Sequence, residues 1–251
     1  MKKLFIVTAL IISLFIRVNV FAAENIVTKP ENVTIKYFKT TTIIDNNKIM
    51  SADKLPLSYT EEITEEEYNS ADVNQTSVTK GNVTIENSYE KLTVSITTIG
   101  SYYRYNADLE WKTMPSTRSY DTIGIGFPSS VKKLGGLYFE QTYCTSASNC
   151  STSTSYVYSY SSTNGVGVTF QQPSGSLYSL NHHMHFNVTK NTTATITSQH
   201  AYGDFAHAIS SVSLTNAKKY TVSPSGIVFQ SGVSSYYNNI GVAEATWYGT
   251  W

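Results

Sequence analysis

The five histidines are the side chains whose spacing most suggests chemistry, because all of them fall in one short stretch of the chain. Side chains alternate between the two faces of a β-strand, so His183 and His185 are expected on one face, where two imidazoles can share a metal ion. His200 or His207 from the next strand would supply a third ligand, with Asp204 as a supporting carboxylate. The candidate metal site is therefore His183, His185 and His200.

A structural role is the alternative for the same histidines. His183 and His185 would then be solvated strand residues, and His200 would bond a neighbouring loop. The chain contains no His-Glu-x-x-His motif, and no glutamate lies within the histidine stretch. These absences favour the structural interpretation over a metal site.

Acidic side chains offer a second kind of chemistry. Glycoside hydrolysis needs two carboxyl groups across one bond, and Asp108, Glu110 and Glu140 are candidates for such a pair. Asp108 and Glu110 fall on the polar side of an alternating run, where solvated charge is the ordinary role. No Gly-x-Ser-x-Gly motif marks a nucleophilic serine. We therefore expect no catalytic residue.

The elements that must position these side chains are predicted to be β-strands. Apolar and polar side chains alternate at every step over residues 103–111, and shorter runs of the same kind follow, separated by Gly, Pro and Asn turns. Glycines separate Ile123, Ile125 and Phe127, where a neighbouring backbone can approach closely. The pattern predicts an all-β antiparallel two-sheet sandwich, with a β-barrel as the second choice.

The start of the chain has the layout of a secretory signal peptide over residues 1–22. Lys2 and Lys3 precede an apolar run over residues 4–16, and Ala22 is a small residue suited to cleavage. We therefore expect a secreted, extracellular protein.

The next part of the chain is more polar than the rest. We expect residues 23–81 to form a polar segment with one or two strands, including residues 33–38, and a short helix over residues 64–71. Thr64 is placed to cap that helix. Residues 82–251 are the predicted sandwich domain.

The chain has two cysteines, Cys144 and Cys150, and both follow the predicted signal peptide. A disulfide persists in an oxidising compartment, so the two are expected to be bonded. They lie between two strand-like runs, so the bond would fix a hairpin locally.

Charge and hydropathy exclude two classes of partner. Lys and Arg total 18 against 18 acidic residues, without the basic excess that nucleic-acid binding requires. Removal of the leader would leave 15 basic and 18 acidic residues. No second apolar stretch reaches membrane-spanning length, so we expect no stable transmembrane anchor.

Several short motifs resemble a group of exported proteins of low-GC Gram-positive bacteria that have no assigned activity. The similarity covers roughly residues 85–245. It is carried by Leu109-Glu110-Trp111-Lys112, Met114-Pro115-Ser116, Arg118-Ser119-Tyr120-Asp121, Gly165-Val166-Gly167-Val168, Gln199-His200-Ala201, Tyr237-Asn238 and Ile240-Gly241-Val242. The resemblance implies bacterial export and one β-rich unit, and it implies no catalytic residue, cofactor or substrate.

The function predicted from these features is noncatalytic. We expect an extracellular binding or surface-interaction module whose ligand is a glycan or a surface protein, because exposed tyrosines stack on sugars and pack at interfaces. One alternative is a membrane-active β-protein, suggested by the Ser/Thr-rich run over residues 151–170, although Tyr156, Tyr158 and Tyr160 give it only a short apolar face. The other alternative is a metal-dependent hydrolase that uses the histidine cluster.

Overall fold

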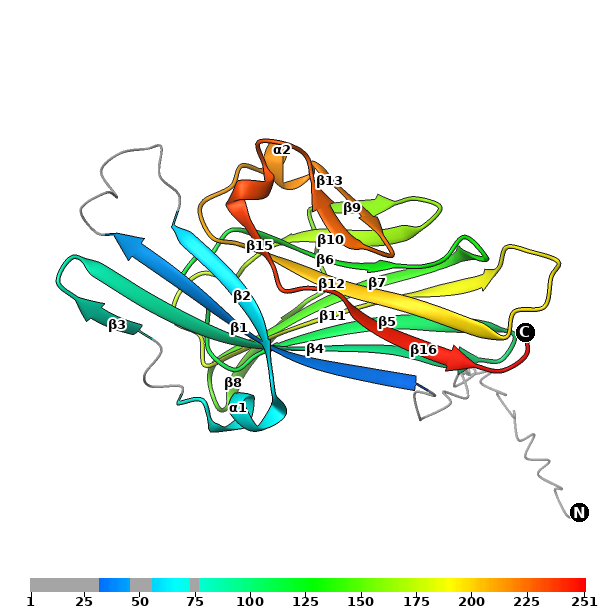
Figure 1. The fold of residues 1–251 in the computed structure, drawn as a ribbon, viewed down its shortest axis with the longest axis horizontal. Helices are drawn as coiled ribbons and strands as arrows, with labels where there is room; N and C mark the ends of the chain where they lie inside the picture. The colour runs from blue at the N-terminus through cyan, green and yellow to red at the C-terminus, as the bar shows by residue number, and fades with distance from the viewer. Residues whose placement is uncertain (1–31, 46–55, 73–76) are drawn as a thin grey trace, which may run out of the picture.

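A computed structural model describes residues 32–45, 56–72 and 77–251 of the chain. Two antiparallel sheets, of eight and six strands, pack over one apolar core (Figure 1). The predicted two-sheet sandwich is confirmed, and the sheets do not close into a barrel. The predicted signal peptide, residues 1–22, lies outside the described residues.

The larger sheet has the strand order β2-β1-β4-β5-β11-β7-β8, and β3 also pairs with β4. Its strands are β1 (Asn32–Asp45), β2 (Leu57–Ile63), β3 (Ser77–Lys80), β4 (Val83–Ile99), β5 (Tyr102–Trp111), β7 (Val131–Ser146), β8 (Asn149–Ser153) and β11 (Ser179–Lys190). All 14 residues of β1 pair with β4. The polar segment 23–81 therefore supplies three strands of the main sheet, where the sequence predicted one or two.

The smaller sheet has the strand order β15-β12-β6-β10-β9, and β16 also pairs with β12. Its strands are β6 (Tyr120–Gly126), β9 (Tyr158–Ser161), β10 (Gly165–Gln171), β12 (Ser198–Ala208), β15 (Tyr237–Asn239) and β16 (Ala243–Tyr248). Its inner face packs on the larger sheet through side chains such as Ile123, Phe170 and Phe205, all of which are buried.

A two-stranded hairpin, β13 (Tyr220–Ser223) with β14 (Gly226–Phe229), covers the outer face of the smaller sheet. Glycines on β6 and β10 make this contact possible. A Cβ at Gly126 would lie 2.0 Å from the Ser223 carbonyl oxygen, and a Cβ at Gly165 would lie 2.3 Å from that of Val222. The close backbone approach predicted for the glycines of β6 is confirmed.

Helices are few and short in the described part of the chain. They are α1 (Glu65–Ser70), α2 (Leu214–Ala217) and the 3-10 turn η1 (Ser234–Tyr236). The predicted cap of α1 is confirmed, since the Glu67 backbone N–H donates to Thr64 Oγ1 at 3.1 Å. None of the helices in the described ranges is long and apolar enough to cross a membrane.

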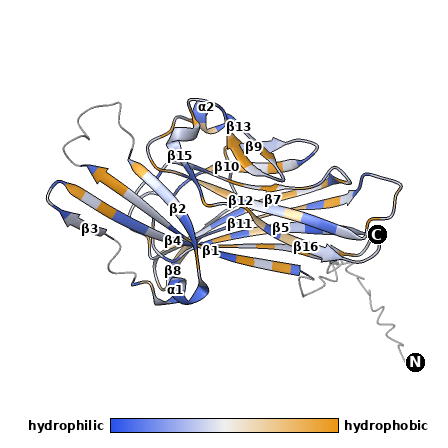
Figure 2. Cartoon of the chain, in the orientation of Figure 1, coloured by the Kyte–Doolittle hydropathy of each residue, from blue (hydrophilic) through white to orange (hydrophobic). Residues whose placement is uncertain are grey.

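Alternation along the strands decides which side chains enter the core. Figure 2 shows apolar and polar residues taking turns along the long strands. On β5, Tyr103, Tyr105 and Leu109 are buried between half-buried polar neighbours. The larger sheet thus has one face in the core and one polar outer face.

Cys144 and Cys150 form the predicted disulfide. The two residues are directly opposite each other on β7 and β8, with their Cα atoms 3.9 Å apart. Because the loop that it closes is short, the bond fixes this hairpin at the sheet edge and leaves the two-sheet core to other forces.

Candidate functional site

Polar side chains stand in rows across four adjacent strands on the outer face of the larger sheet. Strand register places two of these rows side by side, and we call their members the outer polar face. The members are Lys91, Glu110, Asn181 and Thr142 in one row, and Thr93, Asp108, His183 and Glu140 in the other. Neighbouring strands lie about 4.8 Å apart, so side chains within a row are within contact distance.

His183 lies at the centre of a short chain of hydrogen bonds. Its Nδ1 donates to Asp108 Oδ1 at 2.6 Å, and its Nε2 lies 2.8 Å from Nδ1 of His185. An ionised carboxylate only accepts, so the neutral His183 ring carries its proton on Nδ1 and accepts at Nε2 from His185. Nε2 of the neutral His185 ring is then an acceptor, and it makes no hydrogen bond to any of the described residues.

Tyr138 and Glu140 border this chain on β7. The Tyr138 ring stacks on His185 with centroids 5.0 Å apart, and its hydroxyl donates to Glu140 Oε2 at 2.5 Å. The hydrogen bond to Glu140 raises the pKa of Tyr138. Burial, followed by the positive charge of Arg104, lowers the pKa of His185 to about 4. His185 is therefore neutral at pH 7.

The outer polar face encloses a shallow hollow of about 510 Å³. Its lining includes all eight members of the face, with Leu109 and His182 between them. Lys91 Nζ donates to Glu110 Oε2 at 2.5 Å across the rim of the hollow. The hollow therefore offers carboxylates, an amide, an imidazole, an ammonium group and hydroxyls to one ligand.

The structure brings together two of the three predicted metal ligands. His200 lies on β12 of the smaller sheet, where its Nδ1 bonds Glu244 at 2.6 Å. Within the described ranges, no group of three or more His, Cys, Asp or Glu side chains is arranged to hold a metal ion. Asp204 is also separate, because it accepts the backbone N–H groups of Phe205 and Ile227.

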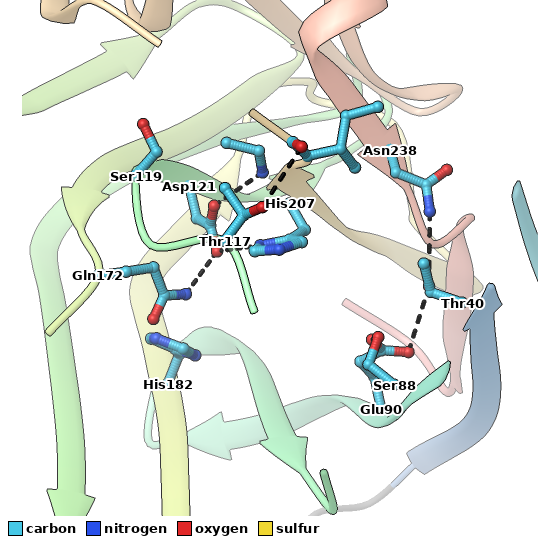
Figure 3. Close-up of polar contacts among 12 residues, drawn as sticks. Thr40, Ser88, Glu90, Thr117, Ser119, Asp121, Gln172, His182, His207 and Asn238 are labelled. Carbon is cyan, nitrogen blue, oxygen red and sulfur yellow. Dashed lines mark hydrogen bonds and ion pairs between the residues drawn. The ribbon is translucent and has the colours of Figure 1, made fainter. Parts of the chain in front are cut away.

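A second polar cluster is buried between the sheets around Asp121 (Figure 3). Asp121 Oδ2 accepts from His207 Nδ1 at 2.9 Å and from Gln172 Nε2, and its Oδ1 accepts from the backbone N–H of Ala208 at 2.9 Å. Asp121 is fully buried and its charge is met by three donors. We call Asp121, His207 and Gln172, together with Glu90 and His182, the interior cluster.

Burial changes the ionisation of the interior cluster. Glu90 accepts from Ser88 Oγ at 2.6 Å, yet burial raises the pKa of Glu90 to about 7. His182 bonds Gln141 through Nε2, and burial lowers the pKa of His182 to about 3. Both groups thus favour their uncharged forms inside the sandwich.

Some polar atoms of the interior have no hydrogen-bond partner among the described residues. They include Trp111 Nε1, Arg118 Nη1, Gln172 Oε1 and His182 Nδ1. A buried polar group without a partner costs about 1–3 kcal/mol, so this part of the core is less stable than an apolar one would be.

The interior cluster was not identified from the sequence, although the alternation of apolar and polar residues along the strands could have revealed it. Glu90 is in phase with the inward-facing Leu92 and Val94 of β4, and Asp121 is in phase with Ile123 of β6. Polar residues at core positions of an alternating strand mark buried networks. Tyr138 was missed for a different reason, since only the pairing of β7 with β11 places it beside His185.

Two comparisons with known proteins return no relative of this chain. No protein-family model matches it. No curated protein matches it either. The resemblance to exported Gram-positive proteins stays a prediction.

Proposed function

We propose that this protein is a noncatalytic, secreted binding protein that recognises a hydroxyl-rich glycan on its outer polar face. The observation that carries the proposal is the pair of cross-strand rows that line one hollow with charged and hydrogen-bonding side chains. Secretion enters the proposal from the predicted signal peptide.

The chemistry of the lining fits a sugar. A sugar hydroxyl both donates and accepts, so it is held best where acceptors such as Asp108 and Glu140 stand close to donors such as Lys91 and Asn181. Bonds to ionised groups are about twice as strong as bonds between neutral groups. Tyr138, half-buried beside the hollow, offers an aromatic ring next to these polar groups.

The state of the three carboxylates supports binding over hydrolysis. Glu110 is paired with Lys91, Asp108 with His183, and Glu140 accepts from Tyr138 and Thr142. A general acid for glycoside cleavage is a carboxyl group in apolar surroundings that keep it protonated. The side chains here lie on an open polar sheet face, where they serve as fixed acceptors.

A glycan array probed with the protein, followed by calorimetric titration of the best ligand, tests the proposal. The Asp108→Asn variant removes the charge at the centre of the face and is expected to weaken binding by about tenfold or more. The Glu244→Gln variant is the matched control, because it alters an exposed His–carboxylate pair of the same 2.6 Å length on the smaller sheet. A blank array, or equal weakening by both variants, contradicts the proposal.

A further inference from the structure

A narrow cleft of about 110 Å³ lies beside the interior cluster, on the far side of the sheet from the outer polar face. Thr40 and Ser88, from the inner side of β1 and β4, form one wall, and Thr117 from the loop after β5 forms the other. His207 also lines the cleft. Figure 3 shows Thr40, Ser88 and Glu90 grouped apart from Thr117, His207 and Asp121.

His207 presents an acceptor atom to this cleft. The residue is only 6% exposed, and its Nδ1 donates to Asp121 at 2.9 Å. Asp121 is itself fixed by Gln172 and the Ala208 backbone, so it fixes the ring with Nδ1 as the donor, and the neutral form of this tautomer has its lone pair on Nε2. Nε2 makes no hydrogen bond within the described part of the chain.

Negative charge gathers around the same cleft. Glu86 lines it directly. Asp121 lies behind His207. No Lys or Arg is among the described residues that line the cleft. Acceptors and negative charge in a small space favour a ligand that is a cation and a hydrogen-bond donor.

We propose that this cleft binds a small organic ammonium ion, with an N–H group donating to His207 Nε2 and Glu86 balancing the charge. The volume accommodates about four water-sized groups at ~30 Å³ each, the size of a short amino alcohol. Ser88 and Thr117 also line the cleft, and their hydroxyl oxygens, which donate to Glu90 and to the Ile209 carbonyl, can still accept from the hydroxyl end of such a ligand. The site is distinct from the outer polar face and does not depend on glycan binding.

Three small probes that each carry one hydroxyl end differ in charge at the other end: ethanolammonium, ethylene glycol and glycolate. They are titrated at constant ionic strength. Backbone amide shifts of Ser88 and Thr117 report binding in the cleft, and the fluorescence of Trp111, whose ring lies 5.1 Å from that of His207, gives a second readout. Ethanolammonium is expected to bind at least about tenfold more tightly than ethylene glycol, and glycolate more weakly than either. Equal or tighter binding of glycolate, or no saturable shift with ethanolammonium, overturns the proposal.

Variants locate the site. Glu86→Gln is expected to weaken ethanolammonium binding by about tenfold, and His207→Gln by a similar factor. Because the His207 variant alters a buried pair, Ser116→Phe provides a second test: Ser116 is exposed at the cleft and a ring there blocks entry with the fold intact. Glu244→Gln, the same charge change on the other sheet, is expected to leave binding unchanged. Wild-type affinity in both Glu86→Gln and Ser116→Phe overturns the proposal.

Discussion

Two pairs of the same residue types, Asp108–His183 and Asp121–His207, occupy opposite environments in this protein. Both histidines donate through Nδ1, at 2.6 Å in the first pair and 2.9 Å in the second. The side chains of the first pair are 50% and 31% exposed, and those of the second are 0% and 8% exposed. The two pairs therefore have similar hydrogen-bond geometry and differ in their exposure to solvent.

The difference in solvent assigns the pairs different roles. Water screens Asp108 and His183, so their attraction adds little to stability, and the groups remain available to a ligand. Asp121 has lost its hydration, and the donors His207, Gln172 and Ala208 compensate for that loss. Removal of one of these donors is therefore expected to destabilise the folded state strongly. We infer that the outer pair serves recognition and that the interior pair maintains the packing of the two sheets.

The largest expected effect comes from replacing the interior carboxylate. Asp121→Asn places an amide where His207 and Gln172 both donate, so the loss is expected to be about 3–5 kcal/mol in the free energy of unfolding. Urea denaturation followed by tryptophan fluorescence measures it. A loss below about 1 kcal/mol would mean that Asp121 is not the centre of the interior cluster.

Burial gives Glu90 a pH-dependent contribution to the stability of the fold. Burial raises its pKa from 4.5 to about 7, so the folded state binds the extra proton between these values. Its contribution to stability is present below about pH 4.5 and is lost as pH rises through 7. As pH rises from 4.5 to 7, the free energy of unfolding of wild type is expected to fall by about 3 kcal/mol relative to that of Glu90→Gln.

His182 supplies a control of opposite sign. Its pKa is lowered from 6.5 to about 3, so the unfolded state binds the extra proton between these values and stability falls as pH falls. His182→Gln is expected to lose less stability than wild type as pH falls from 6.5 to 3. The loss that Glu90 causes as pH rises from 4.5 to 7 is expected to persist in this variant. Parallel unfolding curves for Glu90→Gln and wild type at every pH would contradict the assignment to Glu90.

The sequence predicted elements and faces better than it predicted partners. Alternation predicted that His183 and His185 share one face of a strand, because alternation is local, and in the structure both lie on the outer side while His182 is buried. The contact of His183 with Asp108 depends on which strands pair, and β5 and β11 are far apart in the chain. His200 was grouped with them for the same reason, since local pattern does not reveal that β12 belongs to the other sheet.

The disulfide is expected to have a smaller effect than the interior cluster. It closes a loop with a sequence separation of 6, for which loop entropy gives about 2 kcal/mol. The double variant Cys144→Ser, Cys150→Ser is therefore expected to fold, with this loss at most and with the outer polar face intact. Thermal unfolding with and without reductant checks it, and complete unfolding on reduction would show that the hairpin supports the whole sandwich.

The smallest expected effect on stability belongs to the outer pair. Asp108→Asn is expected to change the free energy of unfolding by less than about 1 kcal/mol, because the pair is half exposed. The same variant is expected to weaken glycan binding by about tenfold or more. A loss of stability comparable to that of Asp121→Asn would remove the distinction between the two pairs.

Mapping the bound glycan by amide chemical shifts tests the central claim most directly. With the best array ligand added to the isotopically labelled wild-type protein, the largest shifts are expected at Thr93, Asp108, Glu140 and His183, across β4, β5, β7 and β11. The interior residues Asp121 and His207 are expected to shift little. Saturable binding whose shifts lie on β12 and β16, with the outer polar face unaffected, would contradict the account.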